Sequence, residues 1–301
     1  MIRVGVDLGG TKIEAIALAP EGRTLGRRRV ETPASDYDAI LRAVADLVAA
    51  VEQEAGGRGT IGVGTPGAIS PKTRLVKNSN TTVLNGRPLA YDLALALNRV
   101  VRLENDANCF ALSEAVDGAG AHAHAVFGVI LGTGVGGGLV IGGRVLKGLN
   151  RIAGEWGHNP LRMSVEEYPG PRCYCGEMGC IETFLCGPAL ERDFCARGGD
   201  KASGAEIAAL ADRGDARALA TLSCYQDRLA RALASVVNLV DPDVIVLGGG
   251  VSNIARLYEG LEPLVERYAF TDSLATKILR NVHGDSGGVR GAAWLWSAGE
   301  G

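Results

Sequence analysis

One histidine and three cysteines lie close together in the middle of this 301-residue chain. His158 stands in EWGHNPL, and Cys173, Cys175 and Cys180 stand in CYCGEMGC. One imidazole and three thiolates are the number and kind of ligands that a closed tetrahedral zinc site uses. The spacing therefore predicts a structural zinc ion, with a redox-active cysteine pair as the alternative. Glu155, three residues before His158, stays free to serve a polar pocket beside the metal.

Two glycine-rich turns follow short apolar segments. The first lies within DLGGTK, after an expected strand at 2–7, and the second is GTGVGGG, after an expected strand at 125–131. They approach a Walker A loop and a G-x-G-x-x-G loop, but both motifs need a helix directly afterwards, and here a strand follows. Backbone N–H groups of hairpin turns can still bind an anion. The pair predicts a nucleotide cleft, with Asp7 placed to hold a hydrated magnesium ion; two ordinary tight turns are the alternative.

The elements that position these groups follow an α/β pattern. Hydrophobic periodicity predicts strands at 2–7, 13–19, 60–65, 100–103, 125–131, 139–141 and 244–247. It predicts helices at 36–53, 89–97, 105–116, within 188–240 and at 285–296. The sequence strand, glycine turn, strand occurs twice, which indicates an internal duplication. The small and polar segment 118–124 predicts a hinge between two domains.

Composition excludes several classes of protein. A hydrophobic content of 47% predicts a folded core, and a net charge of −3 argues against nucleic acid as the main ligand. The start, MIRVGVDLGG, lacks the features of a signal peptide, and no apolar run is long enough to cross a bilayer. Seven cysteines, an odd number at low density, fit a reducing compartment. We therefore expect a cytoplasmic protein with no membrane partner.

Six motifs occur in one order along the chain: DLGGTK (7–12), ENDAN (104–108), LGTGVGGG (131–138), EWGH (155–158), CYCGEMGC-IE (173–182) and LGGG (247–250). Together they resemble the ROK family of sugar kinases over nearly the whole length. The resemblance implies an α/β protein with the actin/hexokinase-like ATPase fold, in which two RNase H-like domains flank a cleft. We place a small domain at 1–118 and a large, zinc-binding domain at 119–284. The last helix, 285–301, is expected to pack on the small domain.

The resemblance also implies the role of each site residue. Asp106 is the expected catalytic base, for which a near-normal pKa is adequate; an acid in the first turn of a helix is the bland alternative. Carboxylates and a zinc-bound imidazole can pair with the hydroxyls of a polyol. The expected sugar contacts are Asn80, Asn105, Glu155, His158 and Glu182. The expected nucleotide and phosphate contacts are Asp7, Gly9, Gly10, Thr11, Lys12, Gly132, Thr133, Gly134, Gly248 and Gly249. The expected zinc ligands are His158, Cys173, Cys175 and Cys180.

Three segments point to one branch of the family. VKNSNTTVLNGRPL, EWGHNPL and HGDSGGVRGAAWLW are most similar to the bacterial fructokinases (mannokinases). This similarity predicts transfer of phosphate from ATP, with magnesium, to the 6-hydroxyl of fructose by a homodimer with structural zinc. The alternatives are glucose, mannose or N-acetylglucosamine as the substrate, or a sugar-responsive regulator without catalysis. Val83 stands where many relatives have a tryptophan, so the pocket wall differs there.

Overall fold

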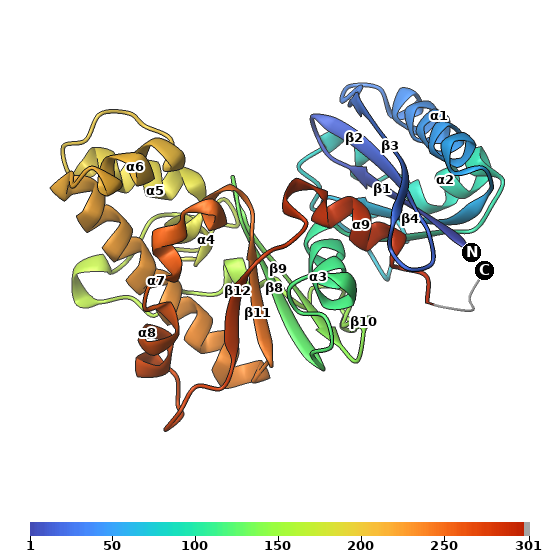
Figure 1. Ribbon diagram of the computed structural model, residues 1–301. Helices are drawn as coiled ribbons and strands as arrows, with labels where there is room; N and C mark the ends of the chain where they lie inside the picture. The colour runs from blue at the N-terminus through green and yellow to red at the C-terminus, as the bar shows by residue number, and fades with distance from the viewer. Residues whose placement is uncertain (298–301) are drawn as a thin grey trace.

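The computed structural model describes residues 1–297, which form two lobes built on five-stranded sheets (Figure 1). The strand order of the first sheet is β3 (Thr24–Glu31), β2 (Lys12–Leu18), β1 (Ile2–Leu8), β4 (Gly59–Thr65) and β7 (Val101–Asn105). The first three strands of the chain form an antiparallel meander, and β4 and β7 extend it in parallel. A two-stranded sheet, β5 (Ala68–Ile69) with β6 (Val76–Lys77), and the single turn η1 (Thr82–Leu84) adjoin it.

Helix α1 (Tyr37–Ala55) covers one face of this sheet with α2 (Leu89–Leu97). Asp36 caps α1 by accepting a hydrogen bond from the backbone N–H of Ala39 at 2.9 Å. Gly56 ends the helix in the left-handed region, at a φ of 75°. The buried side chains recur every three to four residues, as the sequence pattern predicts: Ile40, Val44, Leu47, Val48 and Val51.

The second sheet repeats the connectivity of the first. Its order is β10 (Arg144–Val145), β9 (Val135–Ile141), β8 (Ala125–Leu131), β11 (Val244–Gly248) and β12 (Lys277–Arg280). Again the first three strands form an antiparallel meander, and two parallel strands follow. The shared strand order confirms the internal duplication that the repeated strand-turn-strand pattern predicts.

Five helices cover the outer face of the second sheet: α4 (Glu182–Leu185), α5 (Gly187–Ala196), α6 (Gly204–Asp212), α7 (Ala216–Val240) and α8 (Leu261–Tyr268). Short turns of 3-10 helix lie between elements: η2 (Trp156–His158), η3 (Val165–Glu167), η4 (Gly250–Asn253), η5 (Ala255–Tyr258) and η6 (Gly284–Ser286). Within residues 1–297, no helix is both long and apolar enough to cross a membrane.

Two further helices lie between the sheets. Each comes after a strand of one sheet in the chain but packs on the other sheet. α3 (Asp106–Asp117) comes after β7 but buries Phe110, Ala111 and Leu112 against the second sheet. α9 (Gly287–Ala293) comes after β12 but buries its side chains against β2 of the first. The chain therefore passes between the sheets at 105–106 and again at 281–286. The segment 118–124, predicted as the hinge, instead joins α3 to β8, which pack on each other. We propose domain limits at 1–118 and 119–284 on the basis of the sheets, with α3 and α9 exchanged between them.

Glycines in the strands make this exchange of helices possible. A side chain at Gly5 would overlap the carbonyl oxygen of Val289 in α9. A Cβ at Gly138 would lie 2.7 Å from the carbonyl oxygen of Ala107 in α3. The strand β9 therefore begins at Val135, earlier than the predicted 139, because its glycines belong to the sheet rather than to the turn.

Other elements also differ from the sequence-based expectations, among them the two-residue strands β5, β6 and β10, which were not predicted. β3 and β12 were not predicted, because both are edge strands with few buried side chains and little apolar alternation. The last helix ends at Ala293 rather than at 296. Residues 298–301 of the predicted terminal segment lie outside the described part of the chain.

Candidate active site

The junction of β7 and α3 forms a polar corner between the two sheets. Asn105 caps α3, because its Oδ1 accepts hydrogen bonds from the backbone N–H groups of Ala107 at 2.9 Å and Asn108 at 3.4 Å. Its Nδ2 donates to the carbonyl oxygen of Gly67 at 3.1 Å, which leaves one amide hydrogen for a ligand. Asp106 follows in the first turn of α3, and its Oδ1 accepts from Ala107 N at 2.8 Å. Local helix capping thus fixes the direction of the Asp106 side chain.

Three carboxylates from separate segments act on one another across this corner. Burial, and then the negative charges of Asp106 and Glu14, raise the pKa of Asp7 to about 7. Burial also raises the pKa of Asp106, and Glu155 from the other lobe adds to the rise. The near-normal pKa expected for Asp106 is therefore corrected upward. A carboxylate whose pKa lies closer to neutrality is a stronger acceptor for the proton of an alcohol.

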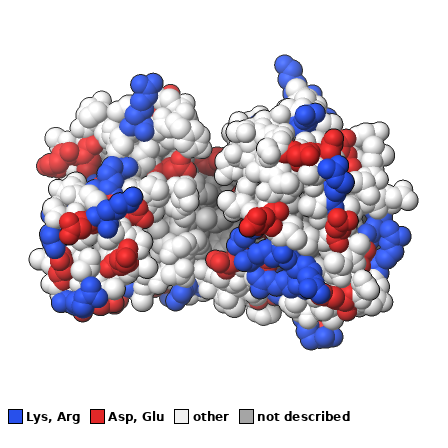
Figure 2. Space-filling view, turned by 90° about the horizontal axis from the view of Figure 1, so that it is seen from above, with Lys and Arg blue, Asp and Glu red and all other residues white. Residues whose placement is uncertain are grey.

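The segment that carries Glu155 and His158 is anchored to the second sheet by the tryptophan between them. Trp156 is buried, its Nε1 donates to Gly136 O at 3.0 Å, and its ring meets Phe127 edge-on, with centroids 5.8 Å apart. Glu155 precedes η2 and is exposed, so its carboxylate is available in the cleft. Figure 2 shows that a hollow separates the two lobes.

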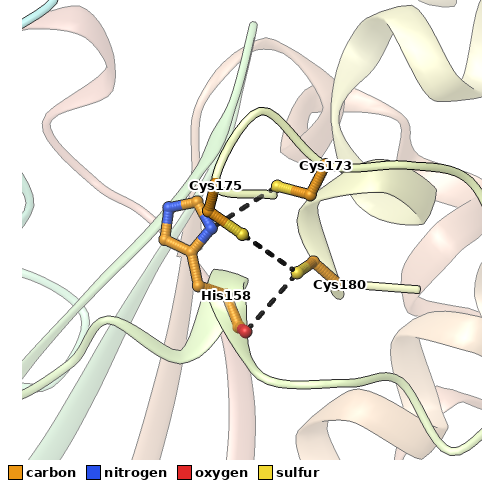
Figure 3. A group of neighbouring side chains, drawn as sticks. All are labelled: His158, Cys173, Cys175 and Cys180. Carbon is orange, nitrogen blue, oxygen red and sulfur yellow. Dashed lines mark hydrogen bonds between the residues drawn. The ribbon is translucent and has the colours of Figure 1, made fainter. Parts of the chain in front are cut away.

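The predicted zinc ligands come together in space (Figure 3). One ligand atom from each of His158, Cys173, Cys175 and Cys180 lies within 4.8 Å of the others. His158 Nδ1 is 3.6 Å from Cys173 Sγ, and Cys175 Sγ is 3.6 Å from Cys180 Sγ. Thiolates on a tetrahedral zinc ion, each about 2.3 Å from it, stand about 3.8 Å apart. Both of these distances are close to that spacing, so the cluster fits a zinc ion.

Electrostatics favours a cation in the same place. The backbone N–H of Glu177 lowers the pKa of the Cys175 thiol. Burial, and then the neighbouring Cys175 and Cys173, raise the pKa of Cys180. Three thiols this close ionise together only when a positive charge lies among them, which a bound metal supplies. No disulfide joins the described cysteines.

Tyr174 is a site residue that the sequence analysis missed. His158 Nε2, the ring nitrogen expected to reach a sugar hydroxyl, lies 3.0 Å from Tyr174 Oη, and the two rings meet edge-on. The signal was its place between two ligands in Cys-Tyr-Cys, because the cysteines bend the loop and direct the intervening side chain outward. A hydroxyl therefore already occupies the position proposed for the sugar.

Glu182 supports the second glycine turn. Its Oε2 accepts from the backbone N–H of Val135 at 2.9 Å, directly after Gly134. One carboxylate oxygen is thus used to hold the turn, and the other is free for a ligand. Gly187 N donates to Gly132 O at 2.7 Å on the other side of the turn, while Thr133 at its tip is exposed.

The remaining predicted nucleotide contacts lie at the ends of strands. In the first turn, Gly9 N donates to Lys12 O at 3.1 Å, and Thr11 is exposed at the tip. Gly249, at a φ of 83°, packs so closely on Leu131 that any side chain would overlap its carbonyl. The LGGG segment, with Gly248, therefore lies directly behind the second turn.

Asn80 is exposed on a segment beside the first turn. A Cβ at Gly10 would lie 3.1 Å from Thr81 Oγ1, which brings this segment next to the turn. Asn85 holds the segment through paired hydrogen bonds with the backbone of Ser79, both of 2.9 Å. Within residues 1–297, no hydrogen bond or ion pair links Asn80 to Asn105 or Asp106. The sugar contact of Asn80 therefore stays a prediction.

These features define the class of the protein. Two lobes of one connectivity, exchanged helices and glycine turns at the ends of matching strands form the actin/hexokinase-like ATPase fold, as the sequence predicted. The ROK family matches residues 3–298, and the chain belongs to this family.

Relatives of established name match nearly the whole length. An N-acetyl-D-glucosamine kinase of Escherichia coli O9:H4 (strain HS) is 42% identical over 297 residues, which cover 97% of this chain and 98% of that protein. An N-acetyl-D-glucosamine kinase of Salmonella paratyphi C (strain RKS4594) is 41% identical over 298 residues, with the same coverage.

Solved structures show the same architecture. The ROK hexokinase from Thermus thermophilus superposes with a TM-score of 0.87 at 36% identity, and the match covers 98% of this chain and 97% of that one. A ROK family glucokinase from Streptomyces griseus, in complex with glucose and AMPPNP, gives a TM-score of 0.78 at 29% identity, with 98% and 99% covered.

Proposed function

We propose that this protein is an ATP-dependent sugar kinase that phosphorylates the 6-hydroxyl of N-acetylglucosamine. The observation that carries the proposal is the position of Asp106, at the crossing between the lobes, facing Asp7 from one sheet and Glu155 from the other. A base at that point can meet a sugar held by one lobe and a phosphate held by both.

In the proposed reaction, Asp106 accepts the proton of the primary hydroxyl while that oxygen attacks the terminal phosphorus of ATP. The bond from this phosphorus to the bridging oxygen breaks, and ADP leaves. Asn105 donates its free amide hydrogen to a neighbouring hydroxyl, and Glu155 and Glu182 accept from others. The glycine turns at 9–12 and 132–134 present backbone N–H groups to the phosphates. Phosphoryl transfer depends mainly on such positioning and on charge neutralisation. Closing of the lobes excludes water, which would otherwise compete as the acceptor.

Magnesium supplies neutralisation of the phosphate charge when it is bound with ATP. The residue suited to hold it is Asp7, through water, because the carboxylate lies at the end of β1 beside the first turn. The raised pKa of Asp7 fits this role, since a carboxyl that is costly to ionise in the free protein gains most from a cation.

The choice of sugar rests on the relatives. Those that match nearly the whole chain at 41–42% identity are named N-acetyl-D-glucosamine kinases. Fructose, which the similarity to the fructokinase branch predicted, has no support among them, whereas N-acetylglucosamine was one of the alternatives. Glucose is the second candidate, because the solved structures of similar fold are named hexokinase and glucokinase.

A coupled ATP-consumption assay over a panel of sugars tests the proposal. We expect kcat/KM for N-acetylglucosamine to exceed that for glucose, mannose and fructose by at least ~10-fold, because pairing of buried polar groups discriminates strongly between sugars. A tenfold preference for glucose or fructose would refute the choice of sugar but not the kinase reaction. Absence of phosphorylation of every sugar, in folded protein, would refute the kinase assignment.

Three further properties belong to the proposal. The zinc ion is structural and orients His158, the protein is cytoplasmic, and it forms a homodimer. Metal analysis, cell fractionation and analytical ultracentrifugation test these in turn.

A further inference from the structure

An ion pair joins the two lobes directly beside the proposed catalytic corner. Glu104, the residue before Asn105 at the end of β7, is almost fully buried, with its side chain 8% exposed. Its Oε2 lies 2.8 Å from Lys147 Nζ. Lys147 follows β10 of the second sheet, so the pair joins a segment of one lobe to a segment of the other. ENDAN contained Glu104, but the sequence analysis gave neither residue a role.

Glu104 also controls the geometry of the corner itself. Its Oε1 accepts from the backbone N–H of Asn105 at 3.1 Å and from Asn108 Nδ2 at 3.1 Å. These bonds fix the turn from strand to helix that presents Asp106. Any shift of the Glu104 carboxylate is therefore passed on to the catalytic aspartate.

Lys147 begins the segment that carries the other wall of the site. The stretch 146–155 leaves the second sheet, where Leu146 N donates to Leu139 O at 2.7 Å, and ends at Glu155. Arg151 from the same stretch lines a small pocket together with Glu104 and Asn105. The ion pair thus stands at the edge of a pocket whose walls come from both lobes.

We propose that the Lys147–Glu104 ion pair is a positioning contact that holds the 146–155 segment of one lobe against the Asn105–Asp106 corner of the other when sugar is bound. The inference rests on the proposed sugar site. A carboxylate this deeply buried needs its charge compensated, and Lys147 compensates it only while the lobes are together. The pair therefore links sugar capture to lobe closure without touching the transferred phosphate.

Lys147→Met tests the contact, because it keeps the length of the side chain and removes the charge. We expect the KM for sugar to rise about 10-fold, the scale for losing one partner of a buried charged pair that is partly open to water. kcat and the KM for ATP should change less than about 3-fold, and ATP hydrolysis without sugar phosphorylation should increase. Lys147→Arg should restore the sugar KM. Arg144→Met, on the exposed edge of β10, is the matched control.

A double-mutant cycle separates positioning from a general structural effect. In a Glu104→Gln background, Lys147→Met should cost less than about 3-fold in sugar KM, because the charge that it compensates is gone. An unchanged sugar KM in Lys147→Met, or an equal loss in the Glu104→Gln background, would overturn the proposal. If Lys147→Met fails to fold, Lys147→Gln gives the same comparison. The wild type measured alongside shows whether the sugar kinase proposal itself holds.

Discussion

The two sheets share one connectivity but differ in chemistry at the same position. In the first sheet, Asp7 of β1 pairs with Glu14 of β2, one position before the last strand pair that leads into the glycine turn. In the second sheet the matching pair is Ile130 with Gly136. Glu14 is 2% exposed and binds two arginines of β3, with Arg27 Nε at 2.6 Å. The strand pair beside the first turn therefore carries two carboxylates, whereas the matching strand pair beside the second turn carries no charged side chain.

The second lobe differs by what has been inserted into it. Between β3 and α1 the first lobe has only the short link 32–36, whereas the second has 146–181 between β10 and α4. That insertion carries Glu155, His158 and the three cysteines. Duplication therefore provided the cleft and its two turns, and the proposed chemistry comes from the places where the copies diverged.

The largest expected effect comes from the acid at the crossing between the copies. Asp106→Asn keeps the shape of the side chain and the hydrogen bond to Ala107 N, so folding should survive. We expect kcat to fall at least ~10²-fold, the scale of general base catalysis. Near-normal turnover in folded Asp106→Asn protein would show that Asp106 is not the catalytic base.

Loss of the metal should remove the main feature that the insertion adds to the second lobe. Cys175→Ser removes one ligand, so we expect loss of the one zinc ion per chain that metal analysis should find in the wild type. Sugar affinity should fall about 10-fold, since residues that orient a metal-bound histidine have effects of this size. Cys224→Ser, away from the cluster, is the control. Full sugar affinity in zinc-free protein would remove the metal from the site.

A substitution in a strand tests how alike the sheets remain. Gly5→Ala would force a methyl group against the α9 backbone, so we expect a loss of about 1–3 kcal/mol in the free energy of unfolding, the usual cost of overpacking. Gly138→Ala should cost a similar amount through α3. Gly250→Ala, with no neighbouring atom within 4 Å, should leave stability unchanged. Thermal or urea unfolding measures all three, and an unaffected Gly5→Ala would refute the close packing.

The smallest effect is a dependence of stability on pH that only the first sheet should show. Burial raises the pKa of Asp7 to about 7, above its value in the unfolded chain. The folded protein then binds the extra proton between about pH 4 and pH 7, so stability falls as pH rises through this window. Asp7→Asn should remove this fall and gain of order 1 kcal/mol at pH 8, although activity decreases. Exposed Asp272→Asn is the control; a wild-type melting temperature that is flat from pH 5 to pH 8 would contradict the prediction.

The sequence predicted those parts of the fold that local patterns determine. Periodicity placed α1 and α2, the cap at Asn105 placed α3, and the cysteine spacing placed the metal cluster. It could not reveal that α3 and α9 exchange sheets, because helix periodicity shows that a helix has a buried face but not which sheet buries it. The glycines at the start of β9 were assigned to the turn, because residues without side chains show no hydrophobic alternation.

The residues of the site could be predicted from the sequence, but the contacts between their side chains could not. The ion pair of Glu104 with Lys147 and the contact of His158 with Tyr174 depend on how distant segments meet. The choice of sugar was also beyond the motifs, since the same polar residues can face several hexoses and the remaining wall of the pocket decides among them.

The exchange of α3 and α9 has a consequence for synthesis on the ribosome. The first sheet begins at residue 2, but on one of its faces Ile16 and Leu18 pack against Val289 and Ala293 of α9, with Trp294 beside them. A growing chain therefore exposes this apolar face until residues 287–293 have been synthesised. The first lobe cannot complete its packing as it emerges from the ribosome. A polypeptide that stops before residue 287 leaves an exposed apolar sheet face that chaperones and proteases can recognise.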